Sequence, residues 1–212
     1  MRRILSLIPA AALTAMLLAQ TPAPKAPAEK PAAVTAPAKK TADAKFTPRK
    51  ADEFVIHMAN GSEKLLSSFR GKLVVMAFMY TTCSHCQHTA GVLGKVQTEY
   101  ADKGVQVLGV TFDGDAPKNV SDFIKNFGVN YPCGYSKAEQ VVKFLHAPDE
   151  YYVPMLAFID KTGMIRSQYI VTGSSNDPAG EFLNAQEINI RKELDKFLKS
   201  PAPAAAKQAP KS

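Results

Sequence analysis

Residues 73–86 read LVVMAFMYTTCSHC, and this stretch decides the fold. Its first part, residues 73–80, is apolar without alternation, which is typical of a central strand covered by helices on both faces. Cys83 and Cys86 follow at C-x-x-C spacing, and residues 84–100 carry apolar side chains at helical spacing. This order predicts a strand-to-helix turn with Cys83 at the helix N-terminus. Unpaired backbone N–H groups and the helix dipole favour a thiolate there, and a thiolate beside a second thiol is the minimum that disulfide exchange requires.

The ends of the 212-residue chain differ in composition from its middle. Residues 1–19 have a charged start and then an apolar run, which predicts a signal peptide cleaved after Ala19 or Ala23; an uncleaved membrane anchor stays open as an alternative. Residues 20–50 are rich in Ala, Pro and Lys and read as a linker, and residues 201–212 as a disordered tail of the same composition. We therefore expect one domain over residues 51–200, exported to the periplasm or another extracytoplasmic space.

The formal net charge of +7 belongs to the ends of the chain rather than to the domain. Residues 51–200 hold 15 basic and 17 acidic side chains, which gives this segment a net charge of −2. A nucleic-acid-binding domain would carry a basic face of its own. We therefore expect no nucleic-acid partner.

The remaining pattern predicts further strands and helices on both sides of the C-x-x-C stretch. Asn60-Gly61 is a strong hairpin signal after a short strand. Strands are expected at 54–58, 105–112, 131–135, 151–160 and 164–171, and helices at 118–127, 137–145 and 181–199. The order βαβα followed by ββα implies an α/β fold with a mixed sheet between helices.

The chain resembles the thioredoxin superfamily, and within it the secreted TlpA/ResA-type thiol–disulfide oxidoreductases with a redoxin domain. The residues that carry the resemblance are 69–72 (FRGK), 83–86 (CSHC), 105–113, Val153-Pro154 and 158–163 (FIDKTG). The resemblance implies a thioredoxin-like three-layer fold, in which a mixed central sheet is flanked by helices. It also implies an N-terminal β-hairpin, a central βα insertion, and the activity of a thiol–disulfide oxidoreductase without a cofactor or metal.

The same resemblance implies the roles of the site residues. Cys83 would be the attacking thiol and Cys86 the resolving one. Pro154 would be the cis-proline that faces the pair, and Val153 would offer its backbone to a bound substrate strand. Ser84 and His85, between the cysteines, would support them.

Two signals disagree on the direction of electron flow. His85 precedes the second cysteine, as in oxidising members of the superfamily, and a cationic or donor group there raises the potential. The wider resemblance covers more of the chain and favours a reductase. We expect protein thiols and disulfides as substrates, a membrane electron donor such as a thiol–disulfide transporter, and a monomer.

Two positions depart from the family pattern. Thr82 stands where the family usually has Trp, and Ala77 stands where thioredoxins carry a buried acid. Proton transfer from Cys86 therefore lacks its usual base. His88 is the nearest substitute, but a surface histidine is the preferred interpretation.

Other functions stay open at this point. The residues Tyr80-Thr81-Thr82-Cys83 are similar to the copper-delivering SCO proteins, although those have three residues between the cysteines and His146 would have to complete the site. A peroxidase-like redoxin is another alternative, whereas structural zinc lacks ligands. Cys133, the odd thiol, is interpreted as a buried apolar residue rather than an intermolecular partner.

Overall fold

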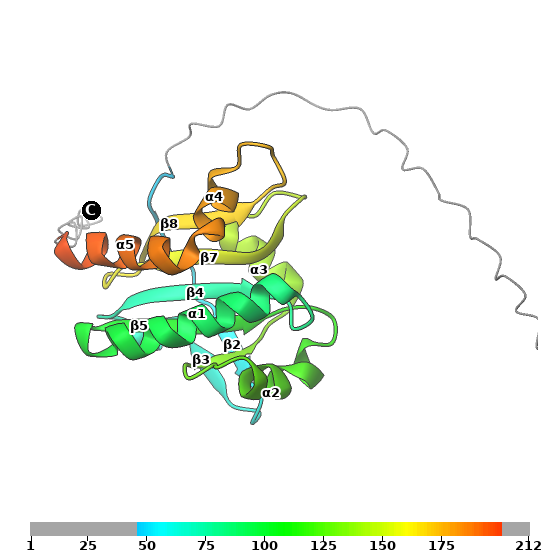
Figure 1. Ribbon diagram of the computed structural model, residues 1–212. Helices are drawn as coiled ribbons and strands as arrows, with labels where there is room; N and C mark the ends of the chain where they lie inside the picture. Colours follow the sequence, from blue (N-terminus) through cyan, green and yellow to red (C-terminus); the bar gives the residue numbers. More distant parts are fainter. Residues whose placement is uncertain (1–45, 201–212) are drawn as a thin grey trace, which may run out of the picture. The chain divides into compact units, whose positions relative to one another are not determined.

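The structure is a computed structural model that describes residues 46–200. The predicted signal peptide, residues 20–45 of the linker and the predicted tail lie outside the described residues. Eight strands form one sheet in the order β1-β8-β7-β4-β5-β6-β2-β3 (Figure 1). The strands are β1 Arg49–Lys50, β2 Val55–Met58, β3 Glu63–Leu65, β4 Leu73–Met79, β5 Val105–Thr111, β6 Cys133–Tyr135, β7 Tyr152–Ile159 and β8 Met164–Val171. The helices are α1 Ser84–Tyr100, α2 Ala116–Asn126, α3 Ala138–Leu145, α4 Pro178–Asn184 and α5 Gln186–Lys199.

The sheet is mixed, as predicted. Strands β4, β5 and β6 run parallel to one another, whereas β7 is antiparallel to β4 and β8 is antiparallel to β7. The N-terminal hairpin of β2 and β3 turns at Asn60-Gly61 and joins the far edge of the sheet through β6. The expected three-layer thioredoxin-like fold is thereby confirmed.

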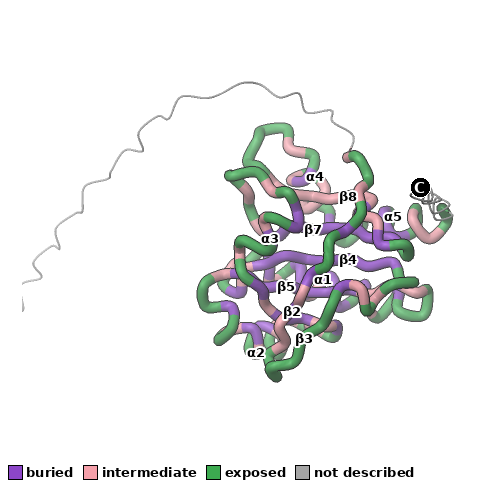
Figure 2. The backbone as a smooth tube through the Cα atoms, turned by 180° about the vertical axis from the view of Figure 1, so that it is seen from behind, coloured by how far each residue is buried: buried purple, intermediate pink, exposed green. Residues whose placement is uncertain are grey.

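Strand β4 explains why its sequence is apolar without alternation. All seven of its residues are buried, and their side chains alternate between two cores. Val75 and Ala77 belong to the core under α1 and α5, while Val74 and Met76 belong to the core that α3 covers. Figure 2 shows β4 and most of β5 and β7 as the buried centre of the sheet.

The predicted C-terminal helix over residues 181–199 is wrong in its extent. The segment forms two helices that break at Ala185, where φ is −120° and ψ is 37°. The first of them, α4, begins at Pro178, and the Asp177 side chain accepts a hydrogen bond from Ala179 N–H. An N-cap Asp followed by Pro is a helix-start signal that the apolar periodicity did not reveal.

The described fold includes residues 46–50, whose composition predicts a linker. Arg49 and Lys50 form β1 and pair with Ile165 and Met164 of β8. The Arg49 guanidinium donates a hydrogen bond of 2.6 Å to the carbonyl oxygen of Phe144, which lies in the last turn of α3. Packing at the sheet edge therefore orders residues whose local composition carries no strand signal.

Candidate active site

Cys83 is the N-cap of helix α1, which begins at Ser84. The backbone of Cys83 is extended, with φ of −84° and ψ of 120°, and its sulfur accepts a hydrogen bond of 3.4 Å from the N–H of Cys86. The sulfur therefore fills the place of the Ser, Thr or Asp oxygen that usually caps a helix. Cys83 is partly exposed and Cys86 is fully buried, so the two thiols differ in their access to solvent.

The Cys86 sulfur lies behind the turn that joins β4 to α1. It accepts a hydrogen bond of 3.4 Å from the backbone N–H of Tyr80. Burial raises the pKa of the Cys86 thiol well above its usual range; the Tyr80 N–H opposes this rise, and the neighbouring Cys83 and the Asp113 carboxylate add to it. Cys86 therefore keeps its proton at neutral pH in the free protein.

The segment Val153-Pro154 faces Cys83, as the resemblance implied. The peptide bond between Val153 and Pro154 is cis. The Cys83 thiol donates a long hydrogen bond of 3.8 Å to the carbonyl oxygen of Val153. The two segments, 70 residues apart in the chain, thus meet at the sulfur that is open to solvent.

A cavity of about 660 Å³ lies beside this meeting point. Its walls come from the first turns of α1, from β7, from the ends of β8 and α4, and from the start of α5. Ser84, His85, His88, Thr89, Tyr152, Val153, Pro154, Val171, Gly173, Gly180, Leu183, Asn184 and Gln186 line it. No Asp, Glu, Lys or Arg is among these residues.

Ser84 and His85 are exposed on this wall. Within residues 46–200, no hydrogen bond joins the His85 side chain to either sulfur of the pair. His88 is also exposed and lines the cavity, which confirms the interpretation of a surface histidine. Ala77 is fully buried in β4, so the acid of thioredoxins has no counterpart at that position.

Asp113 is a site residue to which the sequence alone assigned no role beyond its place at the end of the stretch 105–113. One of its carboxylate oxygens accepts the N–H of Thr81, and the other accepts the Thr81 hydroxyl, both at 2.7 Å. A usable signal was present in the sequence. The carboxyl ends of neighbouring parallel strands meet at one edge of a sheet, so an acid after β5 is expected near the turn after β4.

The structure gives no support to a metal site in the part of the chain that it describes. Residues 46–200 contain no group of three or more His, Cys, Asp or Glu side chains arranged to hold a metal ion. His146, the ligand that a copper site would need, ends α3 in a left-handed conformation with φ of 51°. It does not line the cavity beside Cys83.

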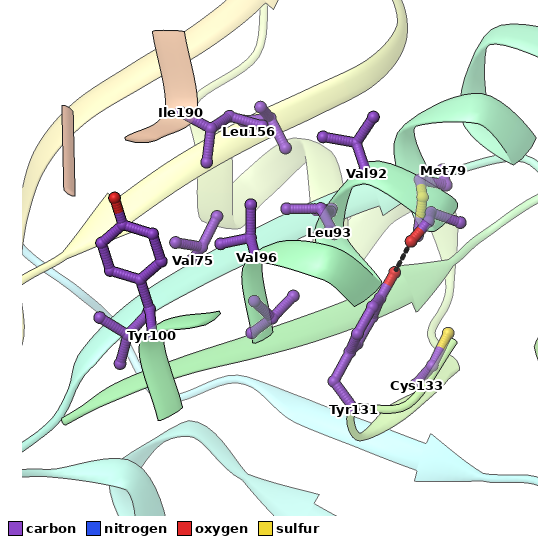
Figure 3. Close-up of a cluster of buried hydrophobic side chains, with 14 of the residues drawn as sticks. Val75, Met79, Val92, Leu93, Val96, Tyr100, Tyr131, Cys133, Leu156 and Ile190 are labelled. Carbon is purple, nitrogen blue, oxygen red and sulfur yellow. Dashed lines mark hydrogen bonds between the residues drawn. The ribbon is translucent and has the colours of Figure 1, made fainter. Parts of the chain in front are cut away.

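Cys133 is buried in the core under α1, as interpreted from the sequence. It is 1% exposed, and burial raises the pKa of its thiol to about 12. It lies opposite Gly109 in the register of β5 and β6. Figure 3 shows it beside Tyr131, whose hydroxyl donates a hydrogen bond of 3.3 Å to the carbonyl oxygen of Ala90 in α1.

Comparison with known proteins agrees with this geometry. The model of the AhpC/TSA family matches residues 48–168. The thiol-disulfide oxidoreductase ResA of Geobacillus thermodenitrificans is 31% identical over 124 residues, which are 58% of this chain and 68% of the relative. The protein of the same name from Bacillus subtilis is 28% identical over 127 residues, which are 60% of this chain and 68% of the relative.

The similarity of this chain to solved structures supports its fold alone. The crystal structure of a thiol:disulfide interchange protein of the thioredoxin family from Chlorobium tepidum superposes with a TM-score of 0.57 at 20% identity, covering 73% of this chain and 99% of that one. Within residues 46–200, no helix is long and apolar enough to cross a membrane. By its family match, its curated relatives and its fold, the chain belongs to the AhpC/TSA family and is a thiol–disulfide oxidoreductase of the TlpA/ResA type within the thioredoxin superfamily.

Proposed function

We propose that this chain is an extracytoplasmic thiol–disulfide reductase in which Cys83 attacks the disulfide of a protein substrate and Cys86 resolves the mixed disulfide. One observation carries the proposal. Cys83 is the partly exposed thiol at the helix N-cap, it faces the Val153 carbonyl, and the buried Cys86 lies directly behind it.

In the first step the Cys83 thiolate attacks one sulfur of the substrate disulfide. A bond forms between Cys83 and that sulfur, the substrate S–S bond breaks, and the departing sulfur leaves as a thiolate that takes up a proton. The Cys86 N–H already points at the Cys83 sulfur at 3.4 Å, which suits negative charge on that atom. The backbone of Val153 would then exchange hydrogen bonds with the bound substrate strand.

In the second step Cys86 loses its proton and attacks the Cys83 sulfur. The mixed disulfide breaks, the second substrate sulfur leaves as a thiolate, and Cys83 and Cys86 become an internal disulfide. Two electrons have then passed from the protein to the substrate. A dithiol with a lower reduction potential must then reduce the Cys83–Cys86 disulfide. The expected donor is a thiol–disulfide transporter in the membrane.

The cellular location of the protein and the direction of electron flow rest on separate arguments. The charged and apolar start of the sequence, residues 1–19, supports export. The TlpA/ResA-type resemblance supports reduction, and His85 would support oxidation if its ring acted on Cys83. Among the described residues the sulfurs bond to Tyr80, Val153 and the Cys86 N–H and not to the His85 ring, which supports a reductase.

The decisive experiment combines trapping with a potential. The variant Cys86→Ala should accumulate a mixed disulfide with a reducible protein such as insulin, visible by mass spectrometry. Cys83→Ala should accumulate none and should not reduce insulin. The matched control Cys133→Ala should keep the parent rate, because Cys133 is buried away from the cavity.

Redox equilibration with glutathione then measures the reduction potential of the Cys83–Cys86 couple, which gives the direction of electron flow. A reductase should have a potential near about −270 mV, and a value near about −120 mV would instead make the chain an oxidant. Insulin reduction that persists in Cys83→Ala would refute the proposal. Steady peroxide turnover that needs only Cys83 would replace it with the peroxidase-like alternative.

A further inference from the structure

We propose that Asp113 is a positioning residue of the redox centre: it fixes the turn between β4 and α1 from which the Tyr80 N–H reaches the resolving sulfur, and its negative charge opposes the thiolate form of that sulfur. This inference rests on the function proposed above, in which Cys86 is the resolving thiol. It assigns a role to an acid that follows β5. The acid that thioredoxins carry on the preceding strand is replaced in this chain by Ala77, on β4.

The sheet register brings Asp113 to this turn. Strands β4 and β5 are parallel and end at the same level, with Met79 paired to Thr111. Phe112 N–H extends the pairing by donating to the Met79 carbonyl oxygen at 3.1 Å. Two residues beyond each strand end, Thr81 and Asp113 therefore meet side by side.

The turn is held from three directions through Thr81. Asp113 accepts both its N–H and its hydroxyl at 2.7 Å. From α1, the Gln87 side-chain amide donates to the Thr81 carbonyl oxygen at 3.0 Å. From α2, the Asn119 amide lies 3.5 Å from the Thr81 hydroxyl oxygen and donates to it.

The hydrogen bond to the resolving sulfur starts from the residue next to this anchor. Tyr80 N–H donates to the Cys86 sulfur at 3.4 Å, and Tyr80 is bonded in the chain to Thr81. A turn that is fixed at Thr81 therefore fixes the direction of the Tyr80 N–H. In this way Asp113 acts on Cys86 through the backbone.

Burial is the main cause of the raised pKa of Cys86, and the negative charge of Asp113 adds to that rise. The titratable groups around Cys86 are Cys83 at the N-cap of α1, Asp113 after β5 and the phenol of Tyr80. Tyr80 and its neighbour Tyr151 pack against the other core. Asp113 is the carboxylate in this set, and its negative charge disfavours a second negative charge on the sulfur. It therefore opposes the Cys86 thiolate, whereas a proton acceptor would promote it.

The substitution Asp113→Asn separates charge from shape. The amide oxygen of Asn can still accept the Thr81 N–H, while the negative charge is gone. Resolution by Cys86 requires its thiolate, so removing the charge should lower the pH at which this step reaches half its maximal rate. A fall of half a pH unit corresponds to about a threefold faster step at any pH below that midpoint.

The test uses the aromatic disulfide 5,5′-dithiobis(2-nitrobenzoate), whose released thiolate absorbs visible light. Attack by Cys83 releases one thionitrobenzoate, and displacement of the second by Cys86 is a separate, unimolecular phase. Stopped-flow measurement of this second phase between about pH 5 and 10 should show the Asp113→Asn rates displaced towards lower pH, and this displacement gives the shift of the midpoint even where the midpoint itself lies above pH 10. Asp115→Asn is the matched control, because Asp115 is an exposed acid that pairs only with Lys118 among the described residues, and its midpoint should stay at the parent value.

A second variant tests the hydrogen bonds of the turn separately from the charge of Asp113. Thr81→Val removes the hydroxyl bond to Asp113 but keeps the charge, so its midpoint should not fall. If Asp113→Asn does not fold, as judged by circular dichroism, Asp113→Ser supplies a neutral acceptor for the same measurement.

The outcomes separate the two proposals. An unchanged midpoint in Asp113→Asn, or a raised midpoint with a slower second phase, would overturn the role given to Asp113. A second phase that survives in Cys86→Ala would instead overturn Cys86 as the resolving thiol, and with it the proposed function.

Discussion

The sulfur of Cys83 lies 3.8 Å from the carbonyl oxygen of Val153. The residue before Val153, Tyr152, lines the neighbouring cavity. Tyr152 is 59% exposed, which is unusual for so large an aromatic side chain. We therefore expect a protein substrate that binds along Val153 to contact the ring of Tyr152.

The first prediction concerns substrate contact at Tyr152. In Tyr152→Ala, the KM for a protein disulfide should rise by about fivefold or more, because exposed aromatic side chains at a contact surface contribute strongly to binding. The rate with a small aromatic disulfide should stay within about twofold, since the sulfurs are untouched. The control is Ile188→Ala: Ile188 is exposed to 58% but does not line the cavity. An equal effect of both substitutions would contradict the prediction.

The second prediction concerns the reactivity of the three thiols. In the folded, reduced protein, iodoacetamide should label Cys83 and leave Cys86 and Cys133 unlabelled. The reason is access, because Cys83 is partly exposed whereas Cys86 is 0% and Cys133 is 1% exposed. Peptide mapping by mass spectrometry gives the answer, with protein unfolded in guanidinium as the control in which all three react. Labelling of Cys133 in the folded protein would show that this thiol is accessible to the reagent and would contradict the prediction.

The third prediction concerns stability at alkaline pH. Burial raises the pKa of Cys133 to about 12, while in the unfolded chain this thiol titrates near its ordinary value of about 8.5. Below the ordinary value both states hold the proton and the stability is complete. Above it only the unfolded state releases the proton, so the free energy of unfolding should fall as pH rises towards 12, by up to roughly 1.4 kcal/mol per pH unit.

Urea unfolding under reducing conditions measures this effect. Cys133→Ala should cost about 1 kcal/mol near pH 7 through the lost sulfur, and its stability should then decline less steeply above pH 9 than that of the parent. Equal slopes for the two proteins would show that Cys133 does not keep its proton in the folded state.

The fourth prediction concerns two glycines inside α1. A methyl group on Gly94 would collide with the carbonyl oxygen of Gly128, whereas on Gly91 it would meet the Phe127 carbonyl oxygen at an ordinary 3.6 Å. Gly94→Ala should therefore destabilise the protein by about 1–3 kcal/mol, and Gly91→Ala should stabilise it by about 0.5–1 kcal/mol through helix propensity. Thermal unfolding of the pair distinguishes them, and a stabilising Gly94→Ala would show that α1 does not pack closely on the turn at Gly128.

Local patterns in the sequence predicted much of this fold for identifiable reasons. The continuous apolar run of β4 reports burial on both faces, and Asn60-Gly61 specifies a turn by its own backbone preference. The C-terminal helix failed as a prediction because apolar periodicity continues across Ala185, although the backbone there is not helical. The strand at Arg49–Lys50 has no local signal, since it depends on the edge of β8.

The candidate site divides in the same way. By itself, the sequence determined that two thiols stand at the start of a helix after a buried strand, and its resemblance placed Val153 and Pro154 opposite them. Only the tertiary structure decided that Asp113 holds Thr81, that a cavity opens beside Tyr152, and that Cys86 is enclosed by burial and by a neighbouring charge. The physical reason is range: capping and periodicity act within a few residues, whereas these contacts depend on which strands become neighbours in the sheet.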